Sequence, residues 1–120
     1  MATVAFTANA QAPLTHGIYT WTPLTTTNTD GAPVGFAGNA ATIQANGTFG
    51  VGGTVVLQGS NDGTNWATLN DLGGAAISFT AAGLKSVREA PPFMRPFVTG
   101  GDGTTSLTLI LALRRQLVNA

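Results

Sequence analysis

The side chains able to carry out chemistry are few and scattered along this sequence of 120 residues. His16 is the only histidine and cysteine is absent, so a metal site would have to combine His16 with carboxylates. A Ser-His-Asp triad can be composed on paper, but no serine stands in the G-x-S-x-G context that exposes such a nucleophile. We therefore expect His16 to be an ordinary loop residue, and we predict no catalytic residue, no metal site and no cofactor.

The five acidic residues could supply the carboxylate pair of a glycosidase, but their neighbours favour a structural role. Every aspartate stands beside glycine or in an asparagine-rich turn, where its side chain is expected to accept hydrogen bonds from the nearby backbone. Asn61-Asp62-Gly63 also matches part of a calcium loop, yet the acidic positions that would complete an EF-hand are missing. The sequence therefore predicts turn-forming aspartates.

Aromatic and arginine side chains are the remaining candidates, and they indicate binding. Tyr19, Trp21 and Trp66 could form a flat platform for stacking a sugar ring, although aromatic residues beside a hairpin usually pack across neighbouring strands. Arg95 lies in a predicted strand with Phe93 and Phe97 as neighbours. Because arginine makes bidentate ion pairs and is enriched at interfaces, we expect Arg95 to be clamped or paired with a partner.

Charged residues make up only 8% of the chain, whereas about a quarter is usual, and the formal net charge is zero. A zero net charge provides no long-range attraction toward nucleic acid or an anionic membrane, so neither is predicted as a partner. It also protects poorly against self-association, which favours a surface that neighbouring molecules cover. No apolar run approaches the roughly 20 residues of a membrane span, and residues 1–6 lack the basic start of a signal peptide. We expect the chain to stay where it is made until a partner takes it.

A hydrophobic period of two recurs along most of the chain and predicts β-strands. It is clearest between Ser106 and Leu113, where every second residue is leucine. The segments 54–60 and 66–69 flank an Asn-Asp-Gly turn and predict a hairpin. Asn46-Gly47 and Asp102-Gly103 predict turns of the same chemistry. Further strands are expected at 18–24, 33–37, 41–45, 76–80, 84–89 and 93–99.

The whole pattern predicts one all-β domain. Short strands at this density, with 16 glycines, six prolines and no window of helical spacing, favour an antiparallel β-sandwich that is jelly-roll-like and has short glycine-rich turns. We expect this single domain to cover residues 16–120, with residues 22–33 as a loop or a sheet edge. Residues 1–15 are expected to form an extended N-terminal arm that a partner orders.

Two stretches resemble part of a known family. The run from Val56 to Trp66 reads Val-Leu-Gln-Gly-Ser-Asn-Asp-Gly-Thr-Asn-Trp, and the run from Phe93 to Gly100 reads Phe-Met-Arg-Pro-Phe-Val-Thr-Gly. Together they resemble the second half of discoidin-like sandwiches. The opening half of that family has no counterpart here, so its ligand-binding loops are not carried over. The resemblance leaves a carbohydrate-binding module of discoidin-like type as an alternative function.

The layout of residues 54–113 is more similar to the small capsid decoration (cement) proteins of tailed bacteriophages. Those proteins are short and cysteine-free, and they share the Gly-Ser-Asn-Asp-Gly hairpin, the aromatic-x-Arg-Pro strand and a closing leucine-rich strand. The resemblance implies a non-enzymatic virion protein, made in the host cytoplasm, which binds the major capsid protein outside the head, often as a homotrimer, and stabilises the head. The residues we expect at such an interface are Val4, Phe6, Leu14, Tyr19, Trp21, Thr26 and Arg95.

Overall fold

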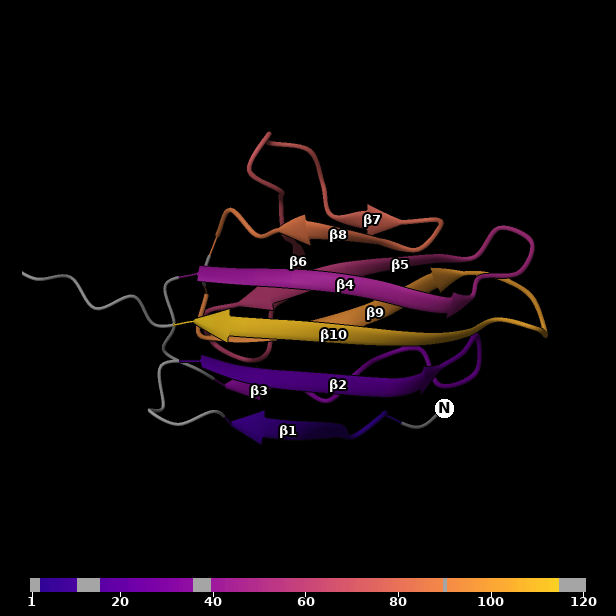
Figure 1. The fold of residues 1–120 in the computed structure, drawn as a ribbon, viewed down its shortest axis with the longest axis horizontal. Helices are drawn as coiled ribbons and strands as arrows, with labels where there is room; N and C mark the ends of the chain where they lie inside the picture. The colour runs from indigo at the N-terminus through magenta and orange to yellow at the C-terminus, as the bar shows by residue number, and fades with distance from the viewer. Residues whose placement is uncertain (1–2, 11–15, 36–39, 90, 115–120) are drawn as a thin grey trace, which may run out of the picture.

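The computed structural model describes residues 3–10, 16–35, 40–89 and 91–114. These residues form ten β-strands and no helix (Figure 1). The strands are β1 (Phe6–Ala10), β2 (His16–Leu24), β3 (Val34–Gly35), β4 (Ala40–Thr48), β5 (Thr54–Ser60), β6 (Ala67–Thr68), β7 (Ser78–Phe79), β8 (Gly83–Ser86), β9 (Phe93–Gly100) and β10 (Ser106–Arg114). The described part of the chain contains no helix with the length and apolarity needed to cross a membrane.

The strands form two antiparallel sheets that enclose one core (Figure 1). The first sheet has the order β1-β2-β10-β4-β8, and the second has the order β3-β9-β5-β6, with β7 also pairing with β5. The strands pair as in one long hairpin that is wound around the core and closed between β5 and β6. Its pairs are β2–β10, β3–β9, β4–β8 and β5–β6. This is the winding of a jelly roll, so the predicted all-β, jelly-roll-like sandwich is confirmed.

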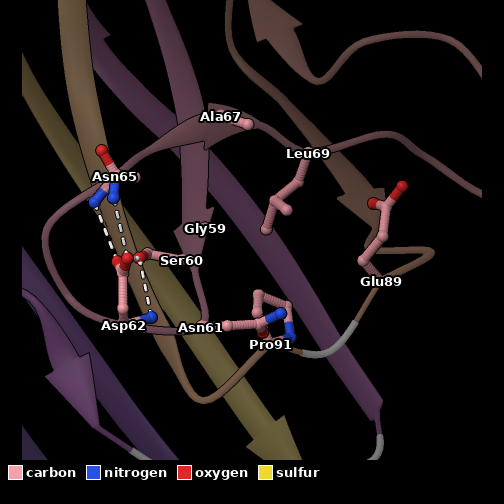
Figure 2. A pocket seen from close by; sticks show the side chains of 9 residues that line it. All are labelled: Gly59, Ser60, Asn61, Asp62, Asn65, Ala67, Leu69, Glu89 and Pro91. Atoms are coloured by element: carbon pink, nitrogen blue, oxygen red, sulfur yellow. Dashed lines mark hydrogen bonds between the residues drawn. The ribbon is translucent and has the colours of Figure 1, made fainter.

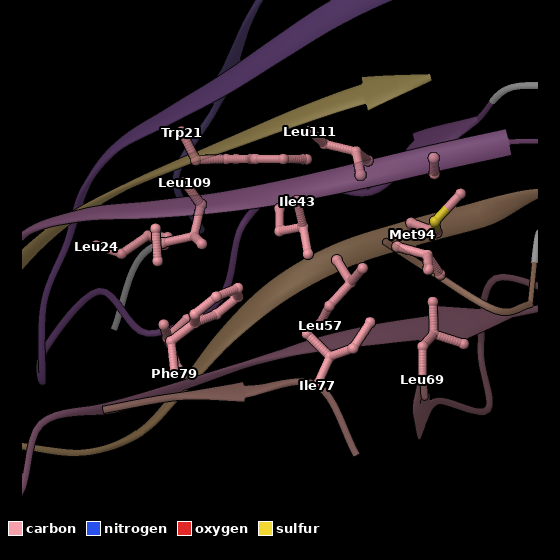
Figure 3. Packing of buried hydrophobic residues seen from close by; sticks show 14 of the residues in the cluster. Trp21, Leu24, Ile43, Leu57, Leu69, Ile77, Phe79, Met94, Leu109 and Leu111 are labelled. Atoms are coloured by element: carbon pink, nitrogen blue, oxygen red, sulfur yellow. The ribbon is translucent and has the colours of Figure 1, made fainter. Parts of the chain in front are cut away.

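The core lies between the sheets and is built by the alternation of each long strand. The four leucines of β10 that alternate with outward residues are each at most 1% exposed. Figure 3 shows Leu109 and Leu111 of the first sheet facing Leu57 and Met94 of the second. Burying one leucine side chain contributes roughly 1.5–3 kcal/mol, so the leucine row of β10 is a main source of stability.

Most of the expected strands are present, with boundaries set by the partner strands. β5 matches its expected range, and β2, β9 and β10 differ from theirs by at most two residues. β3 and β7 are shorter than expected, since each pairs over only two residues. Part of the predicted strand 33–37 falls outside the described residues.

The predicted turn at Asn46-Gly47 is wrong, because both residues lie inside β4. Gly47 has a φ of +114° and stands opposite Leu107 of β10. A Cβ atom there would collide with the carbonyl oxygen of Ser106, so glycine is what lets β4 continue beside β10. The turn into β5 comes later, at residues 49–53.

The N-terminal segment that we expected as an arm lies along the sandwich over residues 3–10. β1 pairs with β2 at the edge of the first sheet. Val4 is held by the loop after β2, because its N–H donates to the Asp30 carbonyl (2.9 Å) and its carbonyl accepts from the Ala32 N–H (2.7 Å). Phe6 meets the ring of Tyr19 edge to face, with 5.5 Å between the ring centres. These residues are therefore placed by contacts within the chain.

Candidate functional site

Trp21 is a core residue, although we expected it at an interface. It is 0% exposed, and its indole Nε1–H donates to the carbonyl of Ala32 (3.0 Å). Burial removes the large ring from water while the carbonyl satisfies its one polar group, which is the usual way a tryptophan is buried. Trp21 is therefore out of reach of a partner or a sugar. Leu14, another expected interface residue, falls outside the described residues.

Most of the other expected interface residues lie beside the first sheet. Val4, Phe6 and Tyr19 are half-buried against the core near β1 and β2. Thr26 is exposed in the loop after β2, where its hydroxyl donates to the carbonyl of Asp102 (3.3 Å). The expected sugar platform of Tyr19, Trp21 and Trp66 is therefore not formed. Trp21 is buried, and Trp66 lies on the second sheet.

Arg95 belongs to the outer face of the second sheet, which gathers aromatic side chains around one cation. Successive residues of a strand point to opposite sides, so the residues of β5 and β9 that alternate with the buried ones face outward. Trp66 joins them from the loop between β5 and β6. We call this surface the Arg95 face; it consists of the half-buried residues Val56, Gln58, Trp66, Phe93, Arg95 and Phe97.

The guanidinium of Arg95 is fixed by contacts on several sides. Gln58 stands opposite Arg95 in the strand register, and Arg95 Nε–H donates to Gln58 Oε1 (2.9 Å). The guanidinium carbon lies 4.3 Å from the centre of the Trp66 ring and 5.7 Å from that of Phe97. At these distances the faces of the rings attract a cation. The expected clamp on Arg95 is therefore formed, while no acidic residue in the described part of the chain pairs with it.

The sequence pointed to Arg95 and its strand neighbours, but not to Gln58 or to the stacking of Trp66 on Arg95. Gln58 is 37 positions away from Arg95, and its contact depends on the register between β5 and β9. The available signal was the alternation in each strand, which places Gln58 and Arg95 on outward positions. Alternation alone does not say which outward residues of two strands meet.

The loop before Trp66 is held rigid by one aspartate. Asp62 Oδ1 accepts hydrogen bonds from the backbone N–H groups of Thr64 and Asn65 and from the Ser60 hydroxyl, each at 2.8 Å. The amide of Asn65 donates to Oδ2 at the same distance. These bonds hold the pKa of Asp62 well below its usual range, and the backbone bonds from Asn65 and Thr64 have the largest effect. The predicted turn-forming role is confirmed here, and the loop presents Trp66 at a fixed position.

Two other carboxylates also accept several hydrogen bonds within the chain, in part from residues far away in the sequence. Asp102 accepts bonds from the Thr104 hydroxyl and N–H and from the Val51 N–H (2.9 Å), which lower its pKa to about 2. Glu89 accepts two bonds of 2.8 Å from the backbone and side chain of Asn70, which lower its pKa. Asp102 therefore ties its own turn to the loop before β5, and Glu89 ties the segment after β8 to the segment between β6 and β7.

A pocket of about 590 Å³ opens at the end of β5, on the other side of the sheet from Arg95. Gly59 faces it, whereas Gln58, the preceding residue of the strand, faces Arg95. Figure 2 shows the carboxylate of Glu89 across the pocket from the hydrogen-bonded loop of residues 60–65. The lining residues are Gly59, Ser60, Asn61, Asp62, Asn65, Ala67, Leu69, Glu89 and Pro91.

The outer face of the first sheet has a different composition. We call it the threonine face; it includes Thr20, Thr22, Thr42, Gln44, Thr108 and Ile110. The hydroxyls of Thr22 and Thr108 share a hydrogen bond of 2.8 Å, and Ile110 stands opposite Thr20 and Gln44. Along β2, β4 and β10 there is no aspartate, glutamate or lysine; the basic residues are His16 at the start of β2, which we expected in a loop, and Arg114 at the end of β10.

No known protein family, no curated protein and no solved structure matches this chain. Within the ranges that the structure describes, no group of three or more histidine, cysteine or acidic side chains comes together as a metal site. Two features of the described surface stand as candidates for binding. They are the Arg95 face and the pocket beside Glu89.

Proposed function

We propose that this protein is a non-enzymatic structural protein of a virus particle, which binds the major capsid protein on the outside of the capsid and stabilises the shell. The observation that carries the proposal is the Arg95 face. Tryptophan, phenylalanine and arginine are enriched in protein interfaces, and tryptophan and arginine are also enriched at the positions that dominate the binding energy. The resemblance of residues 54–113 to capsid decoration proteins supports the same function.

The state of the carboxylates also supports a structural role. Asp62, Glu89 and Asp102 have lowered pKa values because backbone and side-chain donors within the chain stabilise the charged form. A general acid must hold a proton near neutral pH, and a general base needs a pKa close to the working pH. These three groups meet neither requirement.

Sparse charge suits a protein whose surface is covered by repeated neighbours. Only 8% of the residues are charged, so few charges lose water when a face is covered. On a capsid the same contact is repeated by symmetry, and several weak contacts made at once give strong attachment. We propose that a homotrimer is the attaching unit and that the capsid surface is its location, after synthesis in the host cytoplasm.

Reconstitution tests the proposal. Capsids that lack this protein are mixed with the purified chain and sedimented, and their disruption temperature is measured with and without it. We expect the chain to sediment with the capsids at a fixed ratio and to raise the disruption temperature. A chain that neither sediments with the capsids nor raises that temperature would refute the proposal.

A carbohydrate-binding module is the second candidate, favoured by the pocket beside Glu89. Leu69 and Pro91 supply apolar surface, while Asn61 and Glu89 supply polar groups, a combination that suits a sugar ring. The expected result is selective binding on a glycan array that Asn61→Ala weakens and Arg95→Gln leaves unchanged. An array without a selective signal would exclude this candidate.

A further inference from the structure

We infer that the Arg95 face receives a carboxylate from a different protein, and not from a second copy of this chain. The inference rests on the proposed function, in which that different protein is the major capsid protein. It adds the chemistry of the contact, which is a bidentate ion pair between the Arg95 guanidinium and an aspartate or glutamate side chain on the capsid surface.

The guanidinium is arranged to make such a pair. Its Nε–H is used by Gln58, which fixes the plane of the group, and Trp66 and Phe97 restrict it further. The two terminal nitrogens of Arg95 make no hydrogen bond to the described residues. Terminal guanidinium nitrogens match the two oxygens of a carboxylate. Because the side chain is already ordered, binding loses less conformational entropy than it would with a free arginine.

A second copy of the chain offers only acidic side chains that already accept hydrogen bonds in the folded protein. The sequence contains five acidic residues, and all of them lie in the described ranges. Each already accepts hydrogen bonds within its own chain, as Asp71 Oδ1 does from the N–H groups of Gly73 (2.9 Å) and Ala75 (3.1 Å) and as Asp30 Oδ2 does from the Thr3 hydroxyl (3.1 Å). The other three are the loop carboxylates of Asp62, Glu89 and Asp102. In self-pairing, Arg95 would therefore have to compete with donors that these carboxylates already have, whereas a carboxylate on a different protein carries no such cost.

The size of the face fits one of many repeated contacts. β5 and β9 have seven and eight residues, and four strands lie side by side across the second sheet. Because the outer strands β3 and β6 have two residues each, strand spacings give roughly 300 Å² of surface. A standard interface uses about 800 Å² on each partner, so a single contact of this size is weak. An ion pair at its centre would supply specificity, and repetition would supply affinity.

Gln58→Glu is the most discriminating variant. It keeps the shape of the side chain but places a carboxylate beside Arg95 within the chain, where it competes with the partner for the guanidinium. We expect the per-copy affinity for capsids to fall at least about tenfold, while the urea midpoint stays equal to or above that of the wild type. If Arg95 only packs the sheet, Gln58→Glu will bind as well as the wild type.

The binding series uses capsids that lack this protein as the probe. We expect Arg95→Gln to weaken binding to the same extent as Gln58→Glu. Arg114→Gln is the matched control, because it removes one positive charge from the exposed end of β10 and should leave affinity within about twofold. Equal binding by wild type, Gln58→Glu and Arg95→Gln would overturn the ion pair and leave the proposed function intact. Failure of the wild type to bind would overturn both.

Cross-linking identifies the acidic residue that pairs with position 95. Arg95→Lys puts an amine at the centre of the face, and a carbodiimide joins an amine to a carboxylate only when the two are in contact. The expected product is one new cross-link from position 95 to an acidic residue of the capsid protein, found by mass spectrometry. The wild type, whose only lysine is Lys85, serves as the control. A link from position 95 to another copy of this chain would overturn the inference in favour of self-association.

Discussion

The outer faces of the two sheets differ, although one core supports both. The threonine face is broad and carries hydroxyl and amide groups, which water solvates well. The Arg95 face is narrower and presents Trp66, Phe97 and a cation without an acidic partner among the described residues. Covering the first face would remove water from many polar groups, whereas covering the second would bury apolar rings and complete an ion pair. We therefore expect the proposed binding to be concentrated on the second sheet.

The largest expected effect separates the two tryptophans. Trp21→Ala should lower the free energy of unfolding by about 3–5 kcal/mol, because it empties the core beneath the threonine face and leaves the Ala32 carbonyl without its donor. Trp66→Ala should cost much less, since Trp66 is half-buried on an outer face. Urea unfolding of both variants measures the difference. Equal losses would mean that the Arg95 face is as much a part of the core as Trp21.

The second largest loss of stability is expected at Gly47, where β4 lies close beside β10 under the threonine face. Gly47→Ala combines a strained φ with a collision against the Ser106 carbonyl and should cost about 1–3 kcal/mol. Gly103→Ala is the matched control, because a Cβ atom at Gly103 meets nothing within 4 Å. Thermal unfolding should place that control within about 0.5 kcal/mol of the wild type. A Gly47→Ala variant as stable as the control would contradict the close approach.

A charge placed on each face sharpens the comparison directly. Phe97→Lys adds a like charge beside Arg95 and should weaken capsid binding about tenfold or more. Thr42→Lys adds the same charge to the threonine face and should change binding less than about twofold. Sedimentation with capsids measures both. If Thr42→Lys weakens binding as strongly, the threonine face is the docking surface.

The smallest effect is on the acid side of the pH profile. Asp102 has a pKa of about 2, below its ordinary value of 3.8, because Thr104 and Val51 donate to its charged form. Its hydrogen bonds therefore stabilise the fold fully above about pH 4, and that contribution is lost as the pH falls toward 2. The pKa of Asp62 is lowered in the same direction.

Urea unfolding between pH 5 and pH 2 checks this dependence. The wild type should lose stability over that range, and Asp102→Asn should lose less, since its side chain has no proton to gain. A profile that is the same for wild type and Asp102→Asn would show that this loop does not contribute.

Local patterns predicted most of the strands and the roles of the loop residues. The leucines between Ser106 and Leu113 predicted β10 and its buried side, and the Asp62 and Asp102 turns formed as expected. β1 was missed although its residues alternate, because the strand is short and two of its three apolar residues are alanines, so pairing with β2 is what defines it. Gly47 was misread because Asn-Gly marks a turn in isolation, while here glycine accommodates a neighbouring strand.

The sequence by itself determined that this chain is all-β, which residues of each long strand share a side, and that its aspartates form turns. Those features depend on neighbours two to four positions apart. Tertiary structure alone decided that Trp21 lies inside and Trp66 outside, that Gln58 meets Arg95, and that the two outer faces differ. These outcomes depend on which strands pair and in which register, across separations such as the 37 residues between Gln58 and Arg95. Alternation defines two sides of a strand, but only the packing of the sheets decides which side is covered.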